Sequence, residues 1–162
     1  MKDPSNSLEL PDPIWTDALT ICEDLRAGNV SAEDLMTNIY QRINQINSKV
    51  NAIVNLLPEK EAIELARHAD SVPLSERGVL HGLPMAMKDS VAIKGFATTL
   101  GFQPFAERIE TQDSPFAERM RKAGVIFIGH TNMPEFGLGS NTFNSVFGAT
   151  HNPYDLNKTA GG

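Results

Sequence analysis

Glycine is distributed very unevenly along this 162-residue chain. Only Gly28 precedes residue 78, and the rest of the 12 glycines follow it. Because glycine occurs where the backbone needs a positive φ or where another group approaches closely, the second half is predicted to be rich in turns. The acidic excess lies in the other half: residues 1–77 contain 13 Asp and Glu against 7 Lys and Arg, while residues 78–162 contain 7 of each. We therefore expect a helical lead-in over 1–77 and an α/β part over 78–162 that carries the chemistry, both within one domain.

Charge and hydropathy exclude several classes of protein. The net charge of −6 argues against direct binding to nucleic acid, whose phosphates are bound by clusters of Lys and Arg. No apolar run approaches the roughly 18 residues that a membrane span requires, so no membrane partner is expected. The first 15 residues are polar and do not resemble a secretory signal, and the single cysteine, Cys22, cannot form an internal disulfide. These features predict a cytoplasmic protein.

Helical periodicity dominates the first half. Asp12 and Pro13 predict a helix start, and Gly28 predicts its end. Ser31 predicts the N-cap of a second helix, with Asp34 completing a capping box. A strand is expected over residues 50–57, and Pro58 opens a third helix that runs to about Asp70. The side chains expected on the buried faces of the second and third helices are Leu35, Ile39, Ile43, Ile46, Ile63, Leu65 and Ala66.

The second half contains the pattern of a parallel α/β unit. Residues 83–89 alternate as a strand, with Met85 and Met87 on one face and Ala86 and Lys88 on the other. Ser114 caps a helix with Phe116, Met120 and Ala123 as its apolar positions. Residues 125–128 form a short apolar run typical of a strand buried on both faces. The tail, 129–162, is predicted to be mostly loop, with a short helical segment around 133–138.

Apart from Lys88, the residues that commonly bind metals, bind nucleotides or act as nucleophiles do not occur in the patterns that those functions require. The four histidines have no partner at helical spacing, so no metal site is expected. Gly137 and Gly139 lack the third glycine of a dinucleotide fingerprint, and no phosphate-binding Gly-Lys-Ser/Thr motif occurs. Cys22 has no neighbour that would make it a thiolate, which favours a packing role. Lys88 differs, because open α/β sheets bind ligands beyond the carboxyl ends of their strands. From position alone, Lys88 extends into water or pairs with Asp89 as readily as it serves a site.

A resemblance to a known family adds to this interpretation. The matching segments, in order, are Gly82-Leu-Pro-Met-Ala-Met-Lys-Asp89, Thr98-Thr-Leu-Gly101, Asp113-Ser114, Ala123-Gly-Val-Ile-Phe-Ile-Gly129, Thr131-Asn-Met-Pro-Glu-Phe-Gly137, Asn144-Ser-Val-Phe-Gly148, Thr150-His-Asn-Pro-Tyr-Asp155 and Thr159-Ala-Gly-Gly162. Over about eighty residues this ordered set resembles the amidase signature family. The resemblance implies an α/β fold with a mixed β-sheet covered by helices, of which this chain is the incomplete amino-terminal part.

The resemblance also implies a reaction. Members hydrolyse a carboxylic amide to an acid and ammonia or an amine through a Ser, cis-Ser, Lys triad, and Lys88 resembles the lysine. A lysine must lose its proton before it acts as a base, so the site is expected to exclude water from Lys88. Asp89 points to the other face of the strand and need not pair with it. No cofactor and no metal are implied.

The same comparison proposes substrate-binding residues. Phe136, Gly137 and Gly139 resemble the wall of the acyl pocket, and Gly161 and Gly162 would let the chain approach the substrate closely. The alternative is that Phe136 belongs to the core and that the glycines serve turns. Asn132 and Glu135 are expected to hold loops by hydrogen bonds to the backbone, and Thr98 and Thr99 are expected to be structural.

The two serines of the triad are expected beyond Gly162, so the chain is predicted to be a truncated domain without activity by itself. Ser114, Ser140 and Ser145 fall at other motif positions. A general amidase acting on a small-molecule amide is the favoured parent, with a possible homodimer. The alternatives are the A subunit of glutamyl-tRNA(Gln) amidotransferase, a non-catalytic relic, and a binding module that uses Lys88 to hold a carboxylate.

Overall fold

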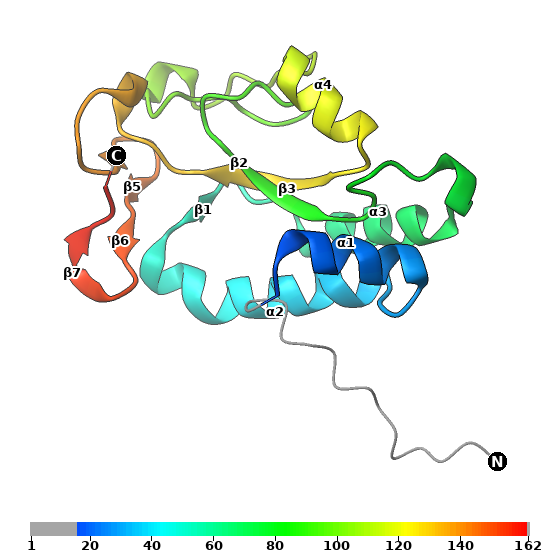
Figure 1. The fold of residues 1–162 in the computed structure, drawn as a ribbon. Helices are drawn as coiled ribbons and strands as arrows, with labels where there is room; N and C mark the ends of the chain where they lie inside the picture. Colours follow the sequence, from blue (N-terminus) through cyan, green and yellow to red (C-terminus); the bar gives the residue numbers. More distant parts are fainter. Residues whose placement is uncertain (1–15, 162) are drawn as a thin grey trace.

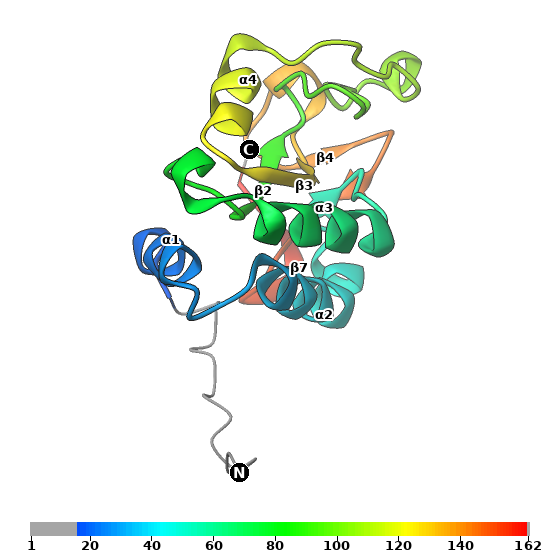
Figure 2. The ribbon, with the colours of Figure 1, turned by 90° about the vertical axis from the view of Figure 1, so that its right-hand side faces the viewer.

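A short central sheet lies between two layers of helices in the computed structural model, which describes residues 16–161. The sheet has the strand order β1-β3-β2, with β1 at Ile53–Val54, β2 at Pro84–Lys88 and β3 at Ile126–Thr131. The helices α1 (Ala18–Ala27), α2 (Ala32–Val50) and α3 (Glu59–Ser71) lie on one side of it, and α4 (Pro115–Lys122) lies on the other (Figures 1 and 2). This mixed arrangement of helices and strands agrees with the α/β class predicted from the sequence.

The helix starts follow the capping residues, with one correction. Ser31 caps α2 by accepting a hydrogen bond from Asp34 N, and its own hydroxyl donates to the Asp34 carboxylate, so the two residues of the predicted capping box are paired. Pro58 precedes α3 as expected. The first helix begins later than predicted: Asp17 caps it, because its side chain accepts from the free amides of Leu19 and Thr20. The predicted start at Asp12 and Pro13 lies outside the described residues.

Small side chains bring α2 and α3 against the sheet. Ala62, Ala66 and Ala69 of α3 are buried in one apolar cluster with Leu35 and Ile43 of α2. Ile46 and Leu65, which were expected to be buried, are 37% and 47% exposed. The prediction for these two residues was wrong because the close approach of the two helices selects alanine at the contact, and larger side chains lie at its margin.

The strand pairing confirms the predicted parallel unit. β2 and β3 pair in parallel, and β1 pairs antiparallel with the other edge of β3. Ala86 packs toward the α2 and α3 side, whereas Met85 and Met87 pack against a second cluster of Ile93, Ala117, Val125 and Phe127 under α4. β3 is buried on both faces, as its apolar run predicted. The expected strand over 50–57 is only two residues long, since α2 continues to Val50.

The crossover helix α4 is capped by Ser114, as predicted. Its most buried residue, however, is not one of the three apolar residues expected to face the core. Ala117 is fully buried, while Phe116 is 50% exposed. After α4, the backbone of Ala123 and Gly124 lies directly against the loop that precedes β2. Leu80 N donates to Ala123 O (2.8 Å), and Gly82 N donates to Gly124 O (2.9 Å). This contact aligns the starts of β2 and β3.

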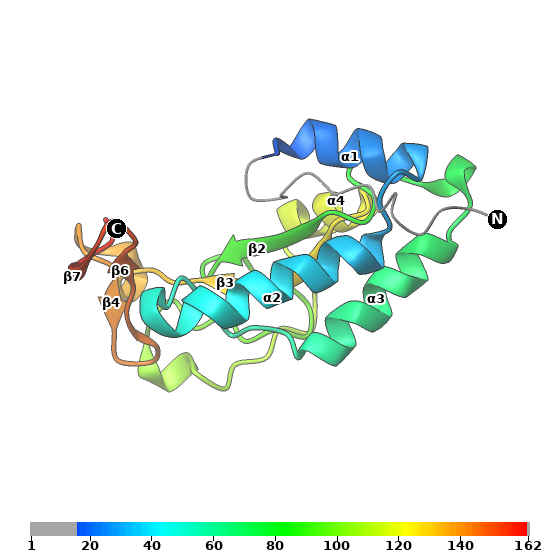
Figure 3. The same ribbon diagram turned by 90° about the horizontal axis from the view of Figure 1, so that it is seen from below.

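The tail contains more regular structure than the sequence predicted. Two short antiparallel ribbons form there, β4 (Phe143–Asn144) with β5 (Gly148–Ala149) and β6 (His151–Asn152) with β7 (Asp155–Thr159). The helical segment expected near 133–138 is a single 3-10 turn, Glu135–Gly137. The ribbons lie beyond the carboxyl end of β2 (Figures 1 and 3). Among residues 16–161, no helix is both long and apolar enough to cross a membrane.

Candidate functional site

Lys88 is the last residue of β2, at the edge where the parallel strands end. It is paired in register with Thr131, the last residue of β3. Its carbonyl oxygen accepts from Val91 N (2.9 Å), so the backbone turns immediately after it. Within residues 16–161, no hydrogen bond or ion pair involves the Lys88 amine. The Lys88 side chain is exposed in the part of the fold that residues 16–161 describe. The expectation that the complete site excludes water from Lys88 stays a prediction.

Asp89 lies on the opposite side of the same strand end and is completely buried. Its carboxylate accepts from Thr99 N (2.9 Å), from the Thr99 hydroxyl and from Gly101 N (3.3 Å). The Thr99 hydroxyl in turn accepts from Gly101 N (3.0 Å). Three donors on two oxygens satisfy the hydrogen-bonding capacity of this side chain, which would otherwise be costly to bury. The prediction that Asp89 need not pair with Lys88 is confirmed, as is a structural role for Thr99.

His130 lies beside Asp89 and is also fully buried. The Asn55 amide donates to Ala97 O (2.9 Å) and to His130 Nδ1 (3.3 Å), while His130 Nε2 lies 3.1 Å from Val91 O. Since a carbonyl only accepts, Nε2 carries the hydrogen and Nδ1 is the acceptor, which is the neutral tautomer. Asp89 Oδ1 stands 3.9 Å from Nδ1 and forms no ion pair with a neutral ring. Burial lowers the pKa of His130 below its ordinary value, and this outweighs the opposing effects of the Val91 carbonyl, Asp89 and Glu110.

The buried His130 predicts a pH dependence of stability. Because its pKa is lower in the folded than in the unfolded state, the unfolded state binds the proton first as the pH falls below about 6.5. The free energy of unfolding should therefore be greatest above pH 6.5 and should fall with acidification until the folded-state pKa is passed. Urea denaturation between pH 5 and 7.5 measures this. His130→Gln should flatten the dependence, whereas His68→Gln, at an exposed position on α3, should not; an equally steep slope in His130→Gln would contradict the assignment.

The predicted pocket residues Phe136, Gly137 and Gly139 lie near this strand end. Leu100 N donates to Asp89 O (3.3 Å), and Phe136 N donates to Leu100 O (2.8 Å), so two backbone hydrogen bonds connect the Lys88–Asp89 segment to Phe136. Phe136 has a positive φ of 53° and is 46% exposed, so it is not a core residue. Its ring contacts Phe102 (centroids 4.9 Å apart) and Phe105 (6.3 Å). The result is an aromatic wall that is partly open to solvent.

A hollow of about 190 Å³ lies among the loop residues that follow β3. Gly139 lies in its lining, which otherwise comprises Pro134, Glu135, Leu138, Ser140, Asn141 and Phe143. Gly137 and Gly139 both have positive φ, which favours glycine whether or not a ligand approaches. Gly161 reaches the same loop cluster: it pairs with Asn141, and its carbonyl accepts from the Thr142 hydroxyl (2.8 Å). Gly162 lies outside the described residues.

Asparagine side chains hold these loops together. Asn132 donates to Gly148 O (3.1 Å), as predicted. The same prediction for Glu135 was wrong, because its side chain is exposed and makes no hydrogen bond among the described residues. The larger contribution comes from Asn144, which the sequence did not single out. Its amide donates to Asn132 Oδ1 and Met133 O, and its oxygen accepts from Val146 N and Phe147 N. The segment Asn144-Ser-Val-Phe-Gly148 is part of the family resemblance, but its sequence does not indicate that Asn144 is buried and bonded to four partners.

Comparisons with known proteins place this arrangement in a family. A family model described as Amidase matches residues 34–162. The chain belongs to the amidase signature family. It is 36% identical over 151 residues to an acylamidase of Rhodococcus erythropolis, a match that covers 91% of this chain and 31% of the relative. It is also 36% identical over 144 residues to the A subunit of glutamyl-tRNA(Gln) amidotransferase from Alkaliphilus metalliredigens, covering 86% of this chain and 29% of that protein.

The structural comparison agrees with the sequence comparison. A crystal structure of a bacterial aryl acylamidase of the amidase signature family superposes with a TM-score of 0.82 and 28% identity, covering 91% of this chain and 31% of that one. The chain thus spans about 30% of the length of the relatives it matches. It represents a partial amidase signature fold, as the resemblance implied.

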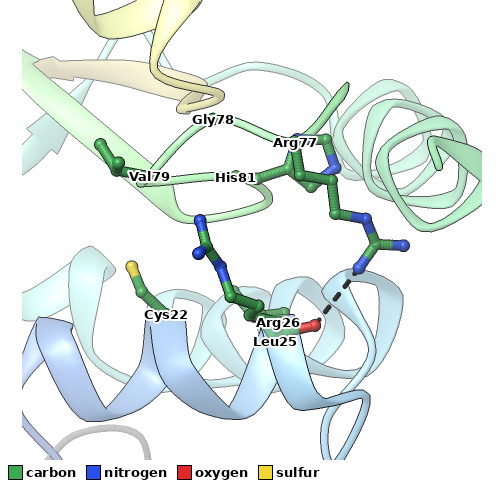
Figure 4. A pocket seen from close by; sticks show the side chains of 7 residues that line it. All are labelled: Cys22, Leu25, Arg26, Arg77, Gly78, Val79 and His81. Atoms are coloured by element: carbon green, nitrogen blue, oxygen red, sulfur yellow. Dashed lines mark hydrogen bonds between the residues drawn. The ribbon is translucent and has the colours of Figure 1, made fainter. Parts of the chain in front are cut away.

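A second hollow lies at the other end of β2 from Lys88. Cys22, Leu25 and Arg26 of α1 face the loop that carries Arg77 and His81 (Figure 4). The Arg77 guanidinium donates to two backbone carbonyls, Leu25 O (3.3 Å), as drawn in Figure 4, and Val72 O (2.9 Å). Burial raises the pKa of the Cys22 thiol, which opposes formation of a nucleophilic thiolate and agrees with a packing role. Across residues 16–161, no group of three or more His, Cys, Asp or Glu side chains could hold a metal ion.

Proposed function

We propose that this segment supplies the lysine base and part of the acyl pocket of an enzyme that hydrolyses carboxylic amides. One observation carries the proposal: the motif lysine, Lys88, ends a central parallel strand, and its amine is not engaged by any group among the described residues. A buried carboxylate next to it in sequence is fully satisfied by other donors, so it does not hold the lysine as an ion pair.

In the proposed reaction, the neutral Lys88 amine accepts a proton from a bridging serine. The bridging serine accepts one from the nucleophilic serine, whose oxygen attacks the amide carbonyl. The proton then returns to the leaving nitrogen, and water releases the acid. For Lys88 to be neutral, water must be excluded from an edge that residues 16–161 leave open, so the remaining part of the amidase fold is proposed to close over it.

The proposed substrate is a small-molecule amide with an apolar acyl group. Phe136 contributes an exposed aromatic face, supported by Phe102 and Phe105, and such a surface favours apolar over charged groups. Gly137 and Gly139 would border the acyl group, and Gly161 and Gly162 would allow close approach of the backbone. No cofactor is proposed. A cytoplasmic location and a homodimeric full-length protein remain predictions.

Assays of the full-length protein that contains this segment test the proposal. Purified alone, it should release ammonia or amine from acyl amides and aryl acyl amides. The second candidate, the A subunit of glutamyl-tRNA(Gln) amidotransferase, is favoured by an equal identity of 36% to a protein of that name. Release of ammonia from glutamine only, and only with added partner proteins, would support that candidate instead. No turnover of any amide under either condition would favour a non-catalytic relic.

A polypeptide of residues 1–162 tested in the same assay should show no turnover. The serines at the other motif positions do not replace those of the triad: Ser114 caps α4 by accepting from Ala117 N, and Ser140 and Ser145 lie on exposed loops. Turnover by this polypeptide that disappears with Lys88→Ala would contradict the requirement for further serines.

A further inference from the structure

We propose that Asp89 is a positioning residue for Lys88: its buried carboxylate, held by Thr99, fixes the turn at the end of β2 and so determines where the lysine amine stands. The inference rests on the proposed role of Lys88 as the base. It concerns a residue on the far side of the strand, which does not contact the substrate.

The contacts of Asp89 tie three segments together at one point. Its backbone N–H donates to Thr131 O (3.0 Å) at the end of β3, and its carbonyl accepts from Leu100 N (3.3 Å). Its carboxylate collects the amides of Thr99 and Gly101 and the Thr99 hydroxyl. Every polar atom of this residue is therefore used to join β2 to β3 and to the 98–101 loop.

These contacts of Asp89 with Thr99, Gly101 and Thr131, called here the Asp89–Thr99 junction, lie one residue after Lys88. The Lys88 carbonyl is held by Val91 N, and the next N–H by Thr131 O, so the peptide group that follows Lys88 is fixed at both of its polar atoms. If the Asp89 carboxylate lost its donors, it would remain buried and unsatisfied, and the turn from 89 to 91 would have to move to reach water. A reacting group displaced by about 1 Å loses about 10²-fold in rate, so a small movement of this turn is sufficient to impair the base.

The adjacent threonines provide a matched pair for the test. Thr98 and Thr99 are both buried, at 4% and 0% exposure. The Thr99 hydroxyl donates to Asp89, whereas Thr98 Oγ1 has no hydrogen-bond partner among the described residues. Replacement by valine keeps the shape of either side chain and removes only the hydroxyl. Thr98→Val should therefore be neutral or stabilising, while Thr99→Val removes one of the donors to Asp89.

The experiment measures kcat, KM and thermal stability of Thr99→Val, Thr99→Ser, Thr98→Val and Asp89→Asn in the full-length protein, per mole of folded enzyme. Thr99→Val is expected to lower kcat about 10- to 100-fold, with KM changed less than about twofold, because only the placement of the base is affected. Thr99→Ser keeps the hydroxyl and should retain kcat, as should Thr98→Val. Asp89→Asn places an amide donor opposite the Thr99 donors and should lower kcat as Thr99→Val does. It tests the same hydrogen bonds in case Thr99→Val does not fold.

Lys88→Ala is included to separate the proposed role of Lys88 as the base from the proposed role of Asp89 in positioning it. If Lys88→Ala is inactive while Thr99→Val and Asp89→Asn keep wild-type kcat, the positioning role is wrong and the proposed function stands. Equal losses of kcat in Thr98→Val and Thr99→Val would also overturn it, because they would indicate general packing. If Lys88→Ala keeps its activity, the proposed function itself fails, and the positioning role fails with it.

Discussion

Lys88→Ala is expected to lower kcat for amide hydrolysis by about 10²- to 10⁴-fold in the full-length protein, which is the usual contribution of a positioned general base. In the polypeptide of residues 1–162 the same substitution should change the stability little, because there the Lys88 side chain is exposed and its amine makes no bond among residues 16–161. The rate of amine release at saturating substrate, together with a melting curve for each variant, checks both parts of the prediction.

Lys88→Arg distinguishes a base from a binding charge. Arginine keeps the positive charge and extends its donors, but it does not lose its proton in proteins. If Lys88 acts as a base, the arginine variant should be about as inactive as the alanine variant. If Lys88 instead holds a substrate carboxylate, Lys88→Arg should retain most activity, and the catalytic role would be contradicted.

Lys122→Ala provides the control for an exposed lysine elsewhere. Lys122 pairs with Glu118 one turn earlier on α4, at 2.6 Å, and both side chains are exposed. A pair of this type contributes roughly 0.3–0.5 kcal/mol. Loss of Lys122 should therefore leave kcat unchanged, and a comparable decrease in both variants would mean that the effect of Lys88→Ala is not specific to the strand end.

Much of the central unit could be predicted from the sequence because its signals are local. Alternation of Met85, Ala86 and Met87 placed each side chain on the correct face of β2, and the apolar run before Gly129 predicted a doubly buried β3. Ser31 and Ser114 predicted two helix starts through hydrogen bonds that span only three residues. Each of these features depends on neighbours in the chain, so no tertiary information was required.

The features that were missed depend on distant partners. Asn51, at the end of α2, donates to Phe147 O (2.7 Å) and Ala149 O (3.1 Å), about a hundred positions later, and thereby holds the β4–β5 ribbon. No local pattern indicates that contact. Likewise, apolar neighbours along a strand do not determine whether another element covers its end, so the sequence did not indicate that Lys88 is exposed among the described residues. For the candidate site, the motif indicated the residues, whereas the Asp89–Thr99 junction required coordinates.

A large loss of stability is expected from Gly124→Ala. A Cβ on Gly124 would stand 2.5 Å from His81 Cα, which is far closer than real atoms approach, and the backbone φ of 98° disfavours any side chain. The obstruction is backbone, so no side-chain rotation relieves it. The Gly82 N to Gly124 O hydrogen bond (2.9 Å) would also have to lengthen, which would misalign the starts of β2 and β3. Overpacking and φ strain together should cost about 3 kcal/mol or more.

Gly28→Ala isolates the contribution of φ alone. Gly28 ends α1 with a φ of 75°, but no atom lies within 4 Å of the position that its Cβ would occupy. Gly28→Ala should therefore lower the free energy of unfolding only by the strain of a left-handed alanine, about 1 kcal/mol. Thermal and urea denaturation of both variants measure the difference, and equal losses would show that the 78–82 loop is not packed against Gly124. A much larger loss in Gly124→Ala would instead establish that glycine is required there by backbone contact, which is one physical origin of the glycine-rich second half of the chain.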